Sequence, residues 1–165
     1  MNISIRPLTE HKSVTAAALF LSQHSGAQPS YISHGELTYG YATSLSEWSE
    51  QHQERVVEDL IHGLNENSIG ITGAFINSSL AGISITSFLD NHRKKVCLLE
   101  DLIIDPQYGN QGIGTALLSH VENLAANANC DLLMLESGIN NTHAHTFFAN
   151  KGFSLTSKVF IKRIE

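Results

Sequence analysis

Apolar and polar residues recur along the chain with two different periods, and these periods predict helices and strands in mixed order. Residues 3–7 alternate as a short strand, and residues 12–23 have the apolar spacing of a helix. Residues 25–43 have no clean period and are expected to be mostly loop. Ser44 can cap a long helix that continues through about Asn65, because apolar residues follow it at helical spacing.

The second half of the chain is richer in strands. The patterns predict a hairpin of residues 68–76 and 80–89, a strand over 95–105, a helix over 112–127, a buried strand over 131–137, a helix over 142–150 with Gly152 just past its end, and a closing strand over 153–164. This order predicts an α/β fold of the mixed α+β type, with a mixed β-sheet flanked by helices, and a single domain over residues 1–165.

Composition narrows the classes of function. The chain has 165 residues, a formal net charge of −6 and only 10 Lys and Arg residues, which argues against nucleic acid as a partner. No apolar run approaches the length of a membrane span, and the N-terminus has no long apolar run typical of a signal peptide. The two cysteines, Cys97 and Cys130, are expected to be buried free thiols, which favours a reducing compartment such as the cytoplasm.

Three glycines, Gly109, Gly112 and Gly114, lie between a predicted strand and a predicted helix. They match neither known phosphate loop, because Thr115 stands where a P-loop has lysine and Leu117 where a dinucleotide fingerprint has glycine. The amides that open the helix nevertheless have no intrahelical acceptor and suit a diphosphate. A tight turn without a ligand is the alternative, and an anion-binding domain unrelated to coenzyme A is another.

Two segments resemble the GNAT superfamily of N-acetyltransferases. LEDLIIDPQYGNQGIGTALL is similar to the superfamily's acetyl-CoA motif, and SGINNTHAHTFFANKGF resembles its N-x-x-A-x-x-F-Y-x-x-x-G-F segment. Together they cover residues 98–153, whereas the first 65 residues contribute only a compatible order of elements. The resemblance implies a splayed mixed sheet with acetyl-CoA, as cosubstrate, wedged between the strands at 96–104 and 131–137.

The resemblance also implies which residues contact that cosubstrate. The strand backbone would pair with the pantetheine arm, through Leu102, Ile103 and Ile104. The glycine loop would hold the pyrophosphate, through Gln111, Gly112, Ile113, Gly114 and Thr115. The second segment would contact the arm, through Asn141, Ala144, Phe147 and Phe148.

The chain departs from the family pattern at two positions. Gly109 stands where Arg or Gln is usual, which is expected to weaken phosphate binding without abolishing it. Phe148 stands where the family has a tyrosine that commonly protonates the leaving thiolate. Together these departures favour an alternative function, a coenzyme A-binding module with little or no catalysis.

Acetyl transfer to an amine needs a base, and Glu100 is the first candidate. Strict alternation puts Glu100 on one face of its strand and Asp101, the second candidate, on the other. The proton donor to the thiolate stays open between solvent, His145 and a tyrosine among Tyr31, Tyr39 and Tyr41.

Acceptor binding is expected in residues 28–48, which combine acidic and aromatic side chains suited to a cationic amine, namely His34, Glu36, Tyr39, Tyr41 and Trp48. Ordinary packing is an equal alternative for Trp48. The expected activity is direct transfer to a primary amine of a small molecule or peptide, with no metal, and with the oligomeric state, a homodimer included, left open.

Overall fold

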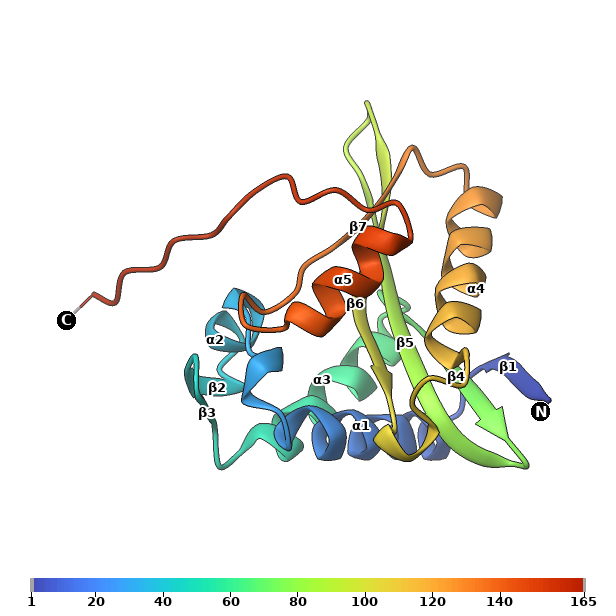
Figure 1. The fold of residues 1–165 in the computed structure, drawn as a ribbon, viewed down its shortest axis with the longest axis horizontal. Helices are drawn as coiled ribbons and strands as arrows, with labels where there is room; N and C mark the ends of the chain where they lie inside the picture. Colours follow the sequence, from blue (N-terminus) through green and yellow to red (C-terminus); the bar gives the residue numbers. More distant parts are fainter. Residues whose placement is uncertain (1, 165) are drawn as a thin grey trace.

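The computed structural model describes residues 2–164, and its centre is a five-stranded sheet (Figure 1). The strands lie in the order β1 (Ile3–Pro7), β4 (Gly70–Ile76), β5 (Ser79–Asp90), β6 (Lys95–Ile104) and β7 (Leu132–Leu135). Neighbouring strands are antiparallel except for β6 and β7, which are parallel. This mixed sheet with helices on its faces confirms the predicted fold class.

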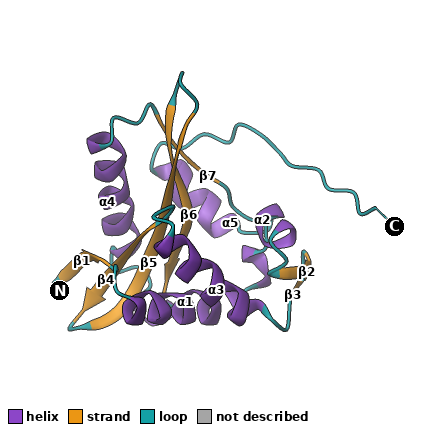
Figure 2. Ribbon diagram, turned by 180° about the vertical axis from the view of Figure 1, so that it is seen from behind, coloured by secondary structure: helices purple, strands orange, loops and turns teal. Residues whose placement is uncertain are grey.

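Helices cover both faces of the sheet (Figures 1 and 2). On one face lie α1 (His11–Gly26) and α3 (His52–Asn65), and on the other lies α4 (Ile113–Asn127). The first face packs Val14, Val56, Ile83 and Ile103 into one buried cluster. Burying each such side chain stabilises the fold by about 1.5–3 kcal/mol, so the two faces together fix the sheet between the helices.

A β-bulge interrupts β6 at the point where the candidate bases lie. Asp101 pairs with Ile85 and Leu99 pairs with Thr86, so Glu100 is an extra residue with no partner across the ladder. Before the bulge, the odd-numbered residues Cys97 and Leu99 pack toward α4, whereas beyond it the even-numbered Leu102 and Ile104 do so.

The prediction that Glu100 and Asp101 lie on opposite faces of a regular strand is therefore wrong. Strict alternation holds only in an uninterrupted strand, and the bulge lets both residues line one cavity.

The parallel pair of β6 and β7 is short. It runs from Val96 opposite Leu132 to Leu99 opposite Leu135, where β7 ends. Since β6 continues to Ile104, its last residues have no strand neighbour on the β7 side within the described chain. The two strands thus part at one edge of the sheet, as the splayed sheet expected from the resemblance requires.

The segment before α3 differs most from its prediction. Residues 25–43, expected to be loop, contain a short 3₁₀ turn, η1 (Pro29–Tyr31), and helix α2 (His34–Thr38). The long helix expected from Ser44 is wrong at its start, because a hairpin of β2 (Ala42–Ser44) and β3 (Glu47–Trp48) precedes α3. Ser33 and Glu36 form a capping box at α2, and this local hydrogen bonding fixes a helix too short to show a period.

Other predicted elements are confirmed within a few residues, but β7, expected to be a buried strand, has Leu132 and Met134 about half exposed. The hairpin turn falls at Asn77 and Ser78, both with positive φ, and α5 (Thr142–Asn150) ends before Gly152, whose φ is +88°. The closing strand is the exception: residues 154–164 form no helix or strand and run out from the body (Figure 1). A strand needs a neighbour to supply its hydrogen bonds, and this segment has none in the described chain.

Candidate active site

A cavity of about 140 Å³ lies where β6 and β7 part. Its floor is formed by β6 from Leu99 to Ile103, and the segment that follows β7 forms one side. Elements of the N-terminal half close it from the opposite side, including α2, the β2–β3 hairpin and α3. The cavity therefore joins the N-terminal half of the chain to the region of β6 and β7.

Four carboxylates surround one part of this cavity. Glu100 and Asp101 come from the bulge of β6, Glu36 from α2, and Glu136 from the residue directly after β7. Burial, followed by the charges of Glu36, Glu100 and Glu136, raises the pKa of Asp101 to about 7. Asp101 thus exchanges a proton near neutral pH, as a general base must.

Glu100 has a different environment from its neighbour. It is exposed, and the hydroxyl of Ser87 donates a hydrogen bond to its carboxylate. Glu100 therefore contributes negative charge to the cavity, whereas Asp101 is the carboxyl whose pKa is raised.

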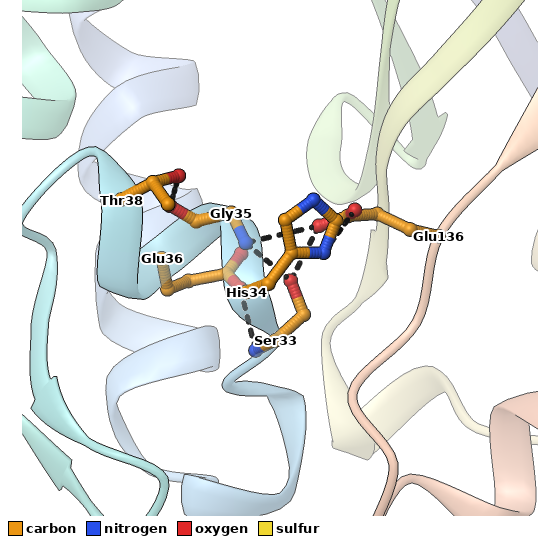
Figure 3. Close-up of polar contacts among 6 residues, drawn as sticks. All are labelled: Ser33, His34, Gly35, Glu36, Thr38 and Glu136. Atoms are coloured by element: carbon orange, nitrogen blue, oxygen red, sulfur yellow. Dashed lines mark hydrogen bonds and ion pairs between the residues drawn. The ribbon is translucent and has the colours of Figure 1, made fainter. Parts of the chain in front are cut away.

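The wall made by α2 is tied to β7 through Glu136 (Figure 3). One carboxylate oxygen of Glu136 accepts hydrogen bonds from Ser33 Oγ at 2.5 Å and from the Gly35 amide at 3.2 Å. The other lies 2.7 Å from Nδ1 of His34. Glu36 points back to accept from the Ser33 amide at 2.7 Å, so this group of side chains fixes α2 over the end of β7.

The main chain after β7 packs closely against the main chain before α2. A Cβ atom on Gly138 would lie 2.5 Å from the carbonyl oxygen of Ser30 and 2.6 Å from that of Ile32. Only glycine allows the chain after β7 to approach the segment before α2 this closely. Main-chain contacts thus fix the position of the wall that α2 and the segment before it form.

Aromatic side chains form the rest of that wall. The Trp48 ring stacks on His52 with 4.2 Å between centroids, and Tyr41 lies 5.9 Å from the same imidazole. Burial lowers the pKa of His52, which keeps it neutral at physiological pH. The Tyr41 hydroxyl donates to Asp59 at 2.5 Å, whereas the buried Nε1 of Trp48 has no hydrogen-bond partner among residues 2–164.

The glycine loop opens α4 in a form that leaves main-chain amides available. Gly112 is the N-cap with φ +83°, and no side chain caps the helix. A Cβ atom would find no atom within 4 Å at Gly112, and at Gly114 it would lie 3.5 Å from the Phe147 ring. The first helical hydrogen bond begins at Ala116, so the preceding amides have no acceptor within the helix.

Predicted cosubstrate contacts fall around these two main-chain features. Leu102 and Ile103 line the cavity, as do Asn141, Ala144 and Phe148 from the segment of α5. The Asn141 side chain accepts from the Ala144 amide at 3.3 Å, which leaves its own NH₂ group to donate. Ile104, Ile113 and Phe147 pack behind the cavity, and Gln111 and Thr115 are exposed at the loop. The contacts themselves stay predictions.

Among the predicted acceptor and acid residues, four line the cavity, namely Tyr31, Glu36, Tyr41 and Trp48. His34, Tyr39 and His145 do not line it. Tyr39 is 72% exposed, and His34 acts on Glu136 instead. His145 is exposed on α5.

The sequence analysis gave no role to three polar residues that line this cavity, Ser33, His52 and Glu136. Glu136 carried a usable signal, because it directly follows the apolar run LLML at the end of a strand. Ser33 lies in the segment that was expected to be loop, where no period indicated which side chains point inward, and His52 lies at the start of α3.

Two further searches of residues 2–164 gave negative results. No three His, Cys, Asp or Glu side chains in this range are grouped as a metal site would need. None of its helices is long and apolar enough to cross a membrane.

Comparisons with known proteins agree with this geometry. The family model described as "Acetyltransferase (GNAT) family" matches residues 37–153. Aminoglycoside N-acetyltransferase AAC(6')-Iy in complex with CoA superposes with a TM-score of 0.71 at 15% identity, over 99% of this chain and 95% of that one. No curated protein matches the sequence with significance.

Two further solved structures have the same fold. AAC(6')-Iy with the bisubstrate analogue CoA-S-monomethyl-acetylneamine gives a TM-score of 0.70 at 16% identity, over 100% of this chain and 99% of that one. Ribosomal-protein-alanine N-acetyltransferase from Brucella melitensis biovar Abortus 2308 gives 0.70 at 13% identity, over 99% and 100%.

Proposed function

Since the chain belongs to the acetyltransferase (GNAT) family, it is an N-acetyltransferase that uses acetyl-CoA, and we propose that its acceptor is a primary amine on a small cationic molecule. The observation that carries this proposal is the combination of four carboxylates and an aromatic wall around one cavity. Carboxylates attract an ammonium group, and aromatic faces bind a cation or the apolar side of a sugar. A peptide amine is the other acceptor of the same chemistry.

The residues present fit acetyl-CoA. The amides at the start of α4 are not used by a side-chain cap, and their glycines leave the main chain open to a diphosphate. The end of β6 has no strand neighbour on the β7 side in the described chain, which suits an amide-containing arm that pairs as a strand would. We propose that these two features hold the pyrophosphate and the pantetheine arm.

Bound acetyl-CoA supplies an acetyl group as a thioester. The chain has to hold the amine beside it, remove a proton and allow direct transfer in a ternary complex. An alkylamine has a pKa of about 10.4 and binds as a cation, so carboxylates serve first to attract it. We assign the removal of its proton to Asp101, directly or through a water, in preference to Glu100, because the pKa of Asp101 is raised to about 7.

Phe148 lines the cavity and has no proton to give, so the acid has to be another group. Tyr31 lines the same cavity, and burial raises the pKa of its hydroxyl, which therefore keeps its proton at neutral pH. Tyr41 is less suited, since its hydroxyl already donates to Asp59. We propose Tyr31 as the donor to the leaving thiolate.

The cytoplasm is the proposed compartment, and a homodimer the proposed state. Cys97 and Cys130 are both free, and burial, with smaller contributions from Cys130 and Glu100, raises the pKa of Cys97 to about 11. A thiol that stays protonated is slow to oxidise. Cys97 is buried as expected, whereas Cys130 is only half-buried.

The proposal is tested by thiol release from acetyl-CoA with a panel of amines. The panel contains amino sugars with several amines, simple diamines, peptides with free N-termini, and neutral hydroxyl analogues of each. We expect turnover with the polycationic small molecules, little with peptides, and none with the hydroxyl analogues. A melting shift with acetyl-CoA but no thiol release with any amine would contradict the proposal and favour a coenzyme A-binding module.

A further inference from the structure

Among the four carboxylates around the cavity, Glu136 is the one whose two oxygens both have partners within the protein. One oxygen accepts hydrogen bonds from Ser33 Oγ and from the Gly35 amide. The other oxygen lies 2.7 Å from Nδ1 of His34. A carboxylate offers about four lone-pair positions, so three of them are already used here. Glu136 is therefore poorly suited to bind the ammonium group of an acceptor.

Glu36 has the opposite balance of partners. One of its oxygens accepts from the Ser33 amide at 2.7 Å, and the other has no hydrogen-bond partner among residues 2–164. The side chain lines the cavity near the proposed base, because its charge is, after burial, the largest contribution to the raised pKa of Asp101. Glu36 thus has a carboxylate oxygen available to an ammonium group at the place where the proton is to be removed.

Glu136 holds the helix that carries Glu36 (Figure 3). Its three partners, Ser33, His34 and Gly35, are the N-cap and the first two residues of α2. We call these three contacts the clasp. A helix of five residues is not stable by itself in water, so the position of α2 depends on contacts such as these. The clasp ends one residue before Glu36, and it therefore fixes the main chain from which that side chain projects.

Gly35 gives an independent indication that the clasp is specific. A Cβ atom on Gly35 would lie 2.7 Å from Oε1 of Glu136. The helix itself does not require glycine here, because Gly35 has no positive φ and alanine is normally favoured over glycine within a helix. The close approach of the Glu136 carboxylate is therefore the feature that a larger residue would disturb.

We propose, on the basis of the cationic acceptor proposed above, that Glu136 is a positioning residue for acetyl transfer. It clasps the start of α2 and so holds Glu36 where Glu36 binds the ammonium group of the acceptor. The two carboxylates then have different roles, since Glu36 meets the acceptor and Glu136 acts on it only through α2. Because Glu136 directly follows β7, the clasp also joins the wall that α2 forms to the strand that parts from β6.

The test separates the position of the Glu136 carboxylate from its charge. Glu136→Ala removes the clasp and should raise KM for the amine about tenfold, the worth of one contact to a charged group. The value of kcat and the affinity for acetyl-CoA should stay within about twofold, because the lost interaction is one of acceptor binding. Gly35→Ala keeps every charge but displaces the Glu136 carboxylate, so it should have the same effect on KM.

Glu136→Gln is the conservative variant. Its amide oxygen can accept from Ser33 and Gly35, and its NH₂ group can donate to Nδ1 of a neutral His34. KM should therefore return to within about threefold of the parent value, although the charge is lost. Thr38→Ala is the matched control on α2, since it removes the hydrogen bond from Thr38 to the Gly35 carbonyl and leaves the clasp intact. It should not change KM.

Hydrogen exchange over residues 33–39 reads the clasp without acetyl transfer. Exchange should become faster in Glu136→Ala and Gly35→Ala and stay as in the parent chain in Glu136→Gln. An equal rise of KM in Glu136→Gln and Glu136→Ala would overturn the proposal, because the charge would then act directly on the acceptor. So would fast exchange in Gly35→Ala with an unchanged KM. A parent chain that acetylates no amine would overturn the proposed acceptor and the positioning role together, whereas exchange would still show whether the clasp holds α2.

Discussion

Two parts of the candidate site offer different kinds of groups to a ligand. Strand β6 and the loop before α4 offer main-chain groups: the end of β6 has no strand neighbour on the β7 side among residues 2–164, and the amides at Gly112, outside the lining of the cavity, open α4. The wall of α2, β3 and α3 offers side chains, among them Glu36 and Trp48. Main-chain groups suit a ligand that stays the same, whereas side chains can be exchanged to suit another acceptor. We expect these two parts of the site to act on different ligands, and each variant below tests one of them.

The largest effect is expected from Asp101→Asn. Removing a general base costs about a hundredfold or more in rate, so kcat/KM for the amine should fall by at least this factor. Affinity for acetyl-CoA, measured by calorimetry, should be unchanged. Glu100→Gln is the matched control and should lose less than tenfold; the opposite ranking would return the role of base to Glu100.

The raised pKa of Asp101 leads us to expect that both activity and stability depend on pH. The carboxylate accepts a proton only when ionised, so kcat/KM should rise as the pH passes about 7, and Asp101→Asn should remove this step. The folded-state pKa lies above the unfolded value, so Asp101 lowers stability as the pH rises from about 4 to 7. The melting temperature of Asp101→Asn should therefore exceed that of the parent chain more at pH 8 than at pH 5.

The next effect is expected at the glycine loop before α4. Gly112→Ala places a side chain at φ +83° beside the helix-opening amides, and should weaken coenzyme A binding by about tenfold with no change in KM for the amine. Gly152→Ala is the control, because its φ is +88° and its Cβ also meets no atom within 4 Å. Both should lose about 1–2 kcal/mol of stability, but only Gly112→Ala should lose affinity. Equal affinities would remove the loop from the binding site.

A smaller effect is expected from Tyr31→Phe. Coenzyme A thiolate is a good leaving group, so losing its proton donor should lower kcat by only about fivefold. In that background Phe148→Tyr should restore the rate, because it returns a hydroxyl to the same cavity. Single-turnover kinetics separate this step from product release. No change in either variant would mean that solvent supplies the proton.

The smallest effect is expected from Trp48→Phe. It keeps an aromatic ring on His52 and removes the Nε1 donor that has no partner in the described chain. One neutral hydrogen bond corresponds to a change of about threefold, which should appear in KM for the amine and not in coenzyme A affinity. An unchanged KM would restrict Trp48 to packing.

The same difference between main-chain groups and side chains explains which parts of the fold and site could be predicted from the sequence. The shape of the glycine loop was predictable, because Gly112 has a positive φ that favours glycine, whereas the role of the loop in binding stays a prediction. The order of elements along the second half of the chain, α4 included, followed from long, regular periods. Membership of the family followed from two motifs that both lie in the second half.

The wall of α2, β3 and α3 was not predictable in the same way. α2 is only five residues long and depends on the Ser33–Glu36 capping box, and its position depends on contacts with Glu136 more than a hundred residues away. The bulge at Glu100 leaves no mark in the alternation of its own strand, since it arises from pairing with β5. Propensity indicated a strand in the C-terminal segment, but no strand among residues 2–164 pairs with it.

The bulge in β6 has a consequence for how this sequence can vary over time. Side chains beyond Glu100 keep their faces because this residue is left out of the pairing with β5. An insertion here that the bulge did not absorb would turn Ile103 toward α4 and Ile104 toward α1, and so exchange residues between two cores. Deletion of Glu100 itself would leave Leu99 and Asp101 paired with the adjacent residues Thr86 and Ile85, which is a regular ladder with the same faces.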